Sequence, residues 1–155
     1  MIPATTIPVT PGWERHLLVR QAGVSSTQMA ELIIKDRDLV VHLTLGEKIL
    51  GFHGDIRVRL SSIVSAAPDP QPWLGLRGWR MAGVSFVGHA VLGTRRHGDG
   101  YDFCILHRDQ PAVRVNVSSG RFSRFVISVP EGGDPGAEAA RIAAAAGIAP
   151  SAPVS

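Results

Sequence analysis

The stretch that decides the fold is DIRVRLSSIV, residues 55–64, in which apolar and charged side chains alternate ahead of two serines. Side chains at every second position of an extended chain share a face, so the apolar residues fall on one side and the arginines on the other. This period predicts a half-buried strand. We expect the strand to bend at Ser61 and Ser62 and to continue through Ile63 and Val64.

Similar signals recur on both sides of that strand. The sequence predicts seven strands, at residues 31–34, 38–44, 56–67, 89–95, 101–107, 112–117 and 125–129. A capping box at Thr44 and Glu47 predicts a short inserted helix. A final helix is expected to begin after Asp134 as its N-cap and to end on Gly147. The order is therefore mainly β with a terminal helix.

Length and composition indicate one globular domain. The chain has 155 residues, of which 45% are hydrophobic and 19% charged, and these proportions exclude a wholly disordered, collagen-like or coiled-coil protein. We expect an N-terminal arm and linker over residues 1–30, the domain over 31–147 and a flexible tail over 148–155. No window resembles a transmembrane segment or a secretory signal, so the expected location is cytoplasmic.

Several short segments share a pattern with a known family: residues 38–41, 47–48, 54–63, 72–73, 76–78, 92–95, 102–103, 111–113 and 125–129. Together with the predicted order of strands and terminal helix, they resemble the pleckstrin-homology-like (PH-like) split barrel, and most closely small actinobacterial proteins with a bacterial PH-like domain. The resemblance implies a split β-barrel of about seven antiparallel strands, one short inserted helix and a C-terminal capping α-helix. It implies no catalytic residue. Phosphoinositide binding by the first hairpin does not carry over, because the acids of the turn at residues 35–38 cancel its bases.

Basic residues are concentrated in the second half of the chain. Residues 77–124 hold eight arginines against three aspartates, a net charge of +5. We expect residues 73–88 to form a long loop over one barrel mouth, because loops of this length are uncommon unless functional. There the guanidinium groups could clamp a phosphate or carboxylate bidentately. Arg121 and Arg124 would join the other arginines at the rim of the barrel mouth, and Phe86 would join the tryptophans in an apolar floor. The candidate binding residues are Trp73, Arg77, Trp79, Arg80, Arg95 and Arg96. The alternative for this segment is a solvated surface.

Motifs for catalysis, metals and nucleotides are missing from the sequence. Ser85 lacks the spacing of a nucleophile elbow, and Cys104 is interpreted as a small buried strand residue. The six histidines show no metal-ligand spacing, and the single cysteine excludes a disulfide within the chain. Residues 97–100 are typical of a hairpin turn. No metal or cofactor is predicted, and nucleic-acid binding is not favoured because no recognised module occurs.

These observations favour a non-enzymatic PH-like binding or scaffolding module for an unknown protein partner or for a second copy in a homodimer. It would bind through a sheet edge or through the mouth under the 73–88 loop, and peripheral membrane contact remains open. The alternative is a small barrel that binds an apolar or anionic ligand under that loop. An enzyme is the third alternative. Branched and aromatic residues favour a filled interior over a ligand cavity: Leu39, Val41, Ile56, Val58, Phe103, Ile105, Val115 and Ile127.

Overall fold

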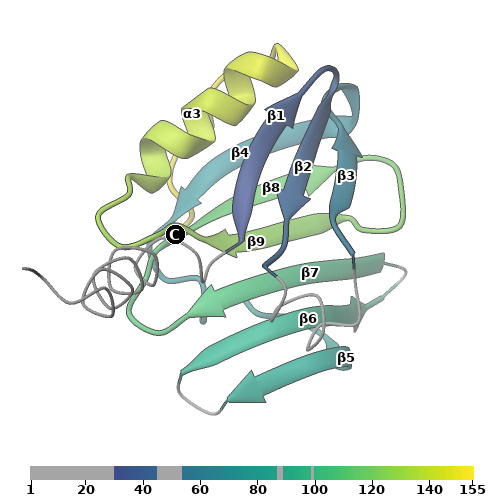
Figure 1. Cartoon of the computed structure of the whole chain (residues 1–155), viewed down its shortest axis with the longest axis vertical. Coiled ribbons are helices and arrows are strands. Elements are labelled where there is room, and N and C mark those ends of the chain that lie inside the picture. The colour runs from purple at the N-terminus through teal and green to yellow at the C-terminus, as the bar shows by residue number, and fades with distance from the viewer. Residues whose placement is uncertain (1–29, 45–53, 87–88, 99) are drawn as a thin grey trace, which may run out of the picture.

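A computed structural model describes residues 30–44, 54–86, 89–98 and 100–155, which form two β-sheets and one helix (Figure 1). The smaller sheet is antiparallel, in the order β1-β2-β3, and comprises β1 (Glu31–Lys35), β2 (Asp38–His42) and β3 (Ile56–Arg59). The larger has the order β4-β8-β9-β7-β6-β5 and comprises β4 (Ile63–Asp69), β5 (Trp79–Phe86), β6 (Ala90–His97), β7 (Gly100–His107), β8 (Ala112–Val117) and β9 (Arg124–Ser128). The helix α3 spans Pro135–Ala146.

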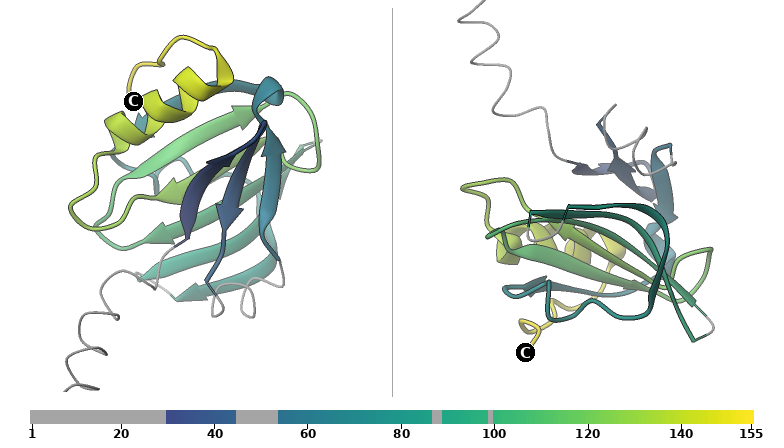
Figure 2. Two further views of the ribbon diagram at one scale, coloured as in Figure 1. Left: turned by 45° about the horizontal axis from the view of Figure 1, so that its top comes forward. Right: turned by 90° about the horizontal axis from the view of Figure 1, so that it is seen from below.

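The smaller sheet and α3 lie side by side on one face of the six-stranded sheet, as Figures 1 and 2 show. The main core fills the space between them, and it draws apolar side chains from both sheets and from the helix. Arg141 on α3 donates a hydrogen bond to the carbonyl of Leu32 on β1 at 2.7 Å, which ties the two covering elements together. Of the predicted interior residues, all are buried except Ile56, which is partly buried at the sheet margin.

The mainly β prediction is confirmed, but the two sheets do not close into a barrel, so the expectation of a closed or nearly closed barrel is wrong. The predicted bend at Ser61 and Ser62 explains the difference. It forms a 3-10 turn, η1 (Leu60–Ser62), which carries the chain out of the smaller sheet. Beyond it, β4 pairs with β8 of the larger sheet instead of extending β3. Residues 56–67 are therefore two strands in two sheets.

The prediction of a loop over residues 73–88 is also wrong for its second half. Strand β5 pairs antiparallel with β6 along its whole length, with a bulge between Arg80 and Ala82. Gly83 and Gly93 face each other with φ of 113° and 141°, and a Cβ on either would lie 2.0 Å from a carbonyl oxygen of the opposite strand. Glycine is needed there because only it tolerates this conformation and this close approach.

The expectation that all strands run antiparallel fails at one pair, because β7 and β9 are parallel. Strand β9 lies between β7 and β8 in the sheet. Strand β9 is antiparallel to β8, the strand that precedes it in the chain. Its other neighbour, β7, runs in the same direction as β9.

The ends of α3 confirm the helix prediction. The Asp134 carboxylate accepts a hydrogen bond from the amide of Gly136 at 2.8 Å, with proline at the helix start. Gly147 ends the helix with φ of 69°, and its amide bonds back to the last turn. Of the predicted arm over residues 1–30, all but Ala30 lies outside the described residues, as do residues 45–53 of the predicted inserted helix.

The C-terminal tail, for which we predicted flexibility, runs beside β4. The amide of Ser151 donates to the carbonyl of Ala66 at 3.4 Å, and the amide of Val154 donates to that of Pro68 at 3.0 Å. The tail therefore occupies hydrogen-bonding groups on the outer edge of β4.

Candidate functional site

The outer face of the six-stranded sheet, turned away from α3, carries a row of polar side chains. Strand register places Arg95, Asp102, Arg124, Asn116 and Ser65 opposite one another on five consecutive strands. Residues 70–78, which connect β4 to β5, lie over this face, where Trp73 and Leu76 pack against a second apolar cluster. The row is therefore enclosed between the sheet and this connection.

Asp102 is at the centre of the row and is fully buried. Its carboxylate contacts Arg77 Nε at 2.9 Å, Arg124 Nη2 at 2.6 Å and His97 Nε2 at 2.9 Å. Arg77 also donates through Nη2 to the second carboxylate oxygen at 3.2 Å, so the contact is bidentate. A buried carboxylate is stable only when its charge is paired and its oxygens are hydrogen-bonded, and both conditions are met here.

The pKa of Asp102 lies below its ordinary value of 3.8. Burial alone would raise this pKa, but the hydrogen bond from Arg77 and the charges of Arg124, Arg77 and His97 outweigh it. Burial likewise lowers the pKa of Arg124, and the Asp102 carboxylate opposes that shift. The carboxylate is therefore ionised at neutral pH and holds the surrounding cations in place.

Ser123, His97 and Asp102 bring together the residue types of a hydrolase triad, but their geometry differs from one. His97 Nε2 contacts both the Asp102 carboxylate at 2.9 Å and the Ser123 hydroxyl at 3.2 Å. A triad uses one ring nitrogen for the acid and the other for the nucleophile. The Ser123 hydroxyl donates to the carbonyl of Tyr101 at 3.1 Å. This arrangement supports a structural network in preference to a nucleophile.

The same network fastens the end of the connection that leads into β5. Arg95 donates through Nε to the carbonyl of Arg77 at 3.0 Å and through Nη2 to that of Gly78 at 2.7 Å. Arg124 Nη2 donates to the carbonyl of Gly75 at 2.9 Å. Two guanidinium groups and three carbonyls therefore fix the backbone immediately before Trp79.

The six candidate residues from the sequence fall into two groups. Trp73, Arg77 and Arg95 belong to the packed connection and its hydrogen bonds. Trp79, Arg80 and Arg96 are exposed at the β5 end of the sheet, where the Arg96 guanidinium lies 6.0 Å from the centroid of the Tyr101 ring.

The expected rim around a barrel mouth does not form. Arg124 is buried in the network instead of lying on a rim, and Arg121 is exposed on the loop after β8. The side chain of Phe86 lies outside the described residues.

Strand β5 lies at the end of the six-stranded sheet, and among the described strands only β6 pairs with it. Trp79 is 83% exposed and Met81 57% exposed, whereas most tryptophan and methionine side chains in folded domains are covered. Arg80 lies between them and is also exposed. The edge thus combines a free side on which no described strand pairs, two large apolar side chains and a positive charge.

Sequence reasoning missed Asp102 as the centre of the network, and with it the roles of His97 and Ser123. One signal was available: Asp102 and Arg124 occupy strand ends that precede apolar runs, where isolated charges need partners. The pairing itself depends on the position of β9 beside β7, which the sequence does not reveal.

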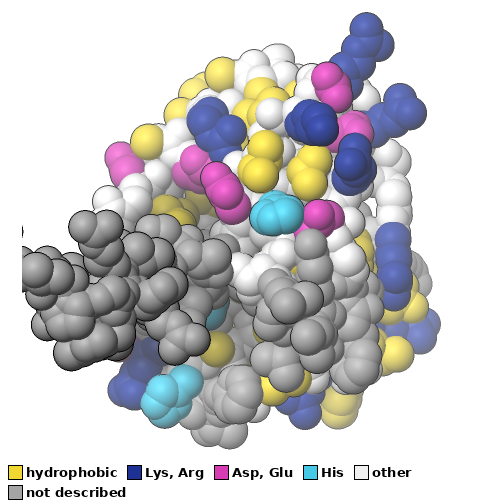
Figure 3. All heavy atoms as spheres, viewed as in Figure 1, with side chains coloured by type: hydrophobic (Ala, Val, Ile, Leu, Met, Phe, Trp, Pro, Cys, Tyr) yellow, Lys and Arg dark blue, Asp and Glu magenta, His cyan; other side chains and the backbone are white. Residues whose placement is uncertain are grey.

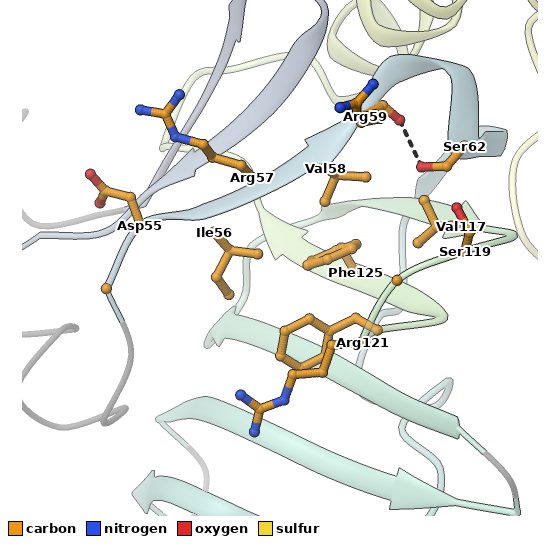
Figure 4. A pocket seen from close by; sticks show the side chains of 13 residues that line it. Asp55, Ile56, Arg57, Val58, Arg59, Ser62, Val117, Ser119, Arg121 and Phe125 are labelled. Carbon is orange, nitrogen blue, oxygen red and sulfur yellow. Dashed lines mark hydrogen bonds between the residues drawn. The ribbon is translucent and has the colours of Figure 1, made fainter.

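A separate cavity of about 550 Å³ opens between β3 and the loop that follows β8 (Figure 4). Arg57, Arg59 and Arg121 line it together with Asp55. Figure 3 shows Lys and Arg side chains gathered along the side of the molecule that carries β3. A second cavity of about 780 Å³ lies at the opposite side, between β1, the end of β9 and the start of α3.

Within the described residues, no group of three or more His, Cys, Asp and Glu side chains is placed to hold a metal ion. None of the helical structure described for this chain has the length and apolar character that crossing a membrane requires. Comparison with protein-family models, with curated proteins and with solved structures finds no match.

Proposed function

We propose that this protein is a binding module that recognises an extended, acidic segment of a partner protein by adding it as a strand to the edge of β5. The observation that carries the proposal is the edge itself, with Trp79 and Met81 exposed beside backbone groups with which no described strand other than β6 pairs. Strand addition gives affinity through main-chain hydrogen bonds and specificity through the flanking side chains. Tryptophan and arginine are also the residue types most enriched at binding hot spots.

The charge of the surface supports an acidic partner. Strands β5 and β6 contain Arg80, Arg95 and Arg96 and no acidic residue. Arg95 is occupied by backbone carbonyls, whereas Arg80 and Arg96 are exposed. A second copy of this chain would bring the same positive charges against their equivalents, and like charges on paired strands are destabilising. Charge complementarity therefore favours an acidic segment over self-association.

The rigidity of the edge supports the same proposal. The Asp102 network fixes the backbone before Trp79, and β6 pairs with β5 along its whole length. A surface that is already ordered loses little conformational entropy when a partner binds.

The PH-like assignment remains part of the proposal. The terminal helix packed beside two sheets supports it, while the unclosed sheets and the parallel pair depart from it. PH-like domains often act as interaction platforms, and this analogy agrees with a binding role.

The test is a fluorescence titration with a synthetic peptide of alternating glutamate and valine, as long as β5. We expect the emission of Trp79 to change on binding, and a lysine–valine peptide of the same length to bind at least about tenfold more weakly. A third peptide with alternate backbone nitrogens methylated retains the charge but cannot complete the strand hydrogen bonds, so it should not bind.

Variants of the edge complete the test, with binding followed by calorimetry. Trp79→Ser should weaken binding of the acidic peptide about tenfold or more, and Arg80→Glu should favour the basic peptide. Arg108→Glu, an exposed arginine beyond β7, is the matched control and should bind as the unmodified protein does. Equal binding of the methylated peptide, or unchanged binding by Trp79→Ser, would show that β5 is not the docking edge.

A further inference from the structure

The cavity beside β3 has an apolar floor. Ile56 and Val58 project from β3 toward Phe125, as Figure 4 shows. Phe122 and Phe125 meet edge to face, with ring centroids 5.4 Å apart, and close the inner wall. The volume of about 550 Å³ falls in the range of roughly 300–1,000 Å³ that is typical of small-molecule sites.

The margin of this cavity is positively charged. Arg57 and Arg59 line the outer margin from β3, where their side chains point to the face opposite Ile56 and Val58 (Figure 4). Arg121 stands on the facing loop, with its guanidinium 5.4 Å from the ring centroid of Phe122. In the part of the chain that the structure describes, none of these three arginines forms an ion pair. The Asp55 carboxylate, by contrast, accepts a hydrogen bond from the amide of Leu43 at 3.1 Å and contacts His42 at 3.2 Å. Within the described residues, this carboxylate therefore forms no ion pair with the three arginines.

Further hydrogen-bond donors line the same wall. The loop passes from Ser119 through Gly120, which has φ of 111°. Within the described residues, the amides of residues 119–121 donate to no protein acceptor. Amide and guanidinium donors together suit an anion with several oxygens, which a phosphate, sulfate or carboxylate provides.

The opposite cavity shows that this charge is local. Beside β1, the lining contains Glu31, Glu131, Asp134 and Glu138 against a single arginine, Arg141. The two openings between the sheet layers are therefore opposite in charge, and only the one beside β3 attracts anions.

We propose that the cavity beside β3 binds an amphipathic anion, in which one apolar chain ends in a phosphate, sulfate or carboxylate group. The chain lies among Ile56, Val58 and Phe125, and the anionic group is held by Arg121 together with the amides of residues 119–121. The site is separate from the β5 edge, so its test is independent of peptide binding. The same chemistry is offered by a free amphiphile in solution and by an anionic lipid in a membrane.

Calorimetric titration with decyl phosphate, below the concentration at which it forms micelles, tests the proposal on the full chain. We expect saturable binding at a single site. Decyltrimethylammonium has the same chain and the opposite charge, and inorganic phosphate has the charge without the chain. Both should bind at least about tenfold more weakly, because the first lacks the anionic group and the second lacks the apolar chain.

Two variants locate the site. Arg121→Gln should weaken decyl phosphate binding about tenfold or more through loss of a charged hydrogen-bond donor, while Arg108→Gln removes an equal charge elsewhere and should have no effect. Ile56→Trp should fill the cavity and abolish binding, with thermal unfolding to confirm that the variant folds. Equal affinity for the phosphate and the ammonium amphiphile, or unchanged binding by a folded Arg121→Gln protein, would overturn the proposal.

Sedimentation with phosphatidylcholine vesicles, with and without phosphatidic acid, distinguishes the two sources of the ligand. Arg121-dependent binding to the acidic vesicles alone assigns the site to a membrane lipid. Arg121-dependent binding of decyl phosphate alone assigns it to a soluble amphiphile. If neither decyl phosphate in solution nor phosphatidic acid in vesicles binds, the proposed site is contradicted.

Discussion

The two outer edges of the six-stranded sheet, β4 and β5, differ in whether another segment of the described chain hydrogen-bonds to them. At β4, the C-terminal tail hydrogen-bonds to Ala66 and Pro68 along the strand. At β5, the described chain adds nothing beyond the strand, and Trp79 is left exposed. Unprotected edges promote unwanted pairing, so proteins usually cover or disrupt them. In the described residues, one edge is covered by the tail, and the other has only a bulge and a positively charged side chain as protection.

The chemistry that holds each edge also differs. The tail is joined to β4 by backbone hydrogen bonds near the surface, whereas the approach to β5 is held by a buried carboxylate and three guanidinium groups. An edge that must present a fixed surface to a partner needs such rigid support. The difference supports the interpretation of β5 as the binding edge.

The largest effect is expected from Asp102→Ala, which removes the centre of the support for β5. Loss of the carboxylate leaves the buried Arg124 without its charge partner, so the free energy of unfolding should fall by about 3–5 kcal/mol. Urea unfolding measures the change. Asp109→Asn, on an exposed aspartate at a turn, is the control and should leave stability nearly unchanged. A loss below about 1 kcal/mol would mean that the network does not hold this edge.

Low pH should lower the free energy of unfolding through the same Asp102 network. The pKa of Asp102 is lower in the folded protein than its ordinary value of 3.8, so the folded state binds the proton more weakly than the unfolded state. Its contribution is complete above that ordinary value and is lost as the pH falls through the folded-state pKa. The slope from this one group is at most about 1.4 kcal/mol per pH unit. Asp102→Asn should flatten the dependence of unfolding free energy on pH below about 4.

A smaller effect is expected at the covered edge. Ser151→Pro combined with Val154→Pro removes both amide donors of the tail and keeps its length. The free energy of unfolding should fall by about 1–3 kcal/mol, from two hydrogen bonds of about 0.5–1.5 kcal/mol each. The uncovered β4 should also promote self-association, which analytical ultracentrifugation detects. Ala152→Pro changes an exposed tail residue between them and is the control; equal behaviour of both proteins would show that the tail does not protect β4.

The smallest effect on stability is expected from Trp79→Ser. The side chain is 83% exposed, so the free energy of unfolding should change by no more than about 0.5 kcal/mol. Thermal and urea unfolding both measure it. Such a result, together with weakened binding of the acidic peptide, separates recognition from folding. A loss of several kcal/mol would instead make Trp79 a structural residue.

Local signals explain which parts of the fold could be predicted. The hairpin of β1 and β2 and the helix α3 follow from alternation and from caps that lie within a few residues of one another. Strand β5 was missed because Gly83 and the bulge after Arg80 interrupt its pattern. The failure to close a barrel depends on how β4 pairs, which is a property of the whole chain.

The candidate site was predictable only in part. The arginines and tryptophans drew attention to the β5 region because they cluster along the chain. Which of them are free and which are engaged depends on contacts between distant residues, such as Arg77 with Asp102 and Arg114 with Asp69. The cavity beside β3 likewise combines residues from two segments that the sequence does not place together.

The burial of Cys104 makes the reaction rate of its thiol a measure of local opening. The thiol belongs to the apolar cluster on which Trp73 and Leu76 pack, and burial raises its pKa to about 12. Thiol reagents attack the thiolate, so Cys104 reacts only from states in which its cover has moved away. The rate of its modification under native conditions therefore reports how often residues 70–78 lift from the sheet, with no label introduced.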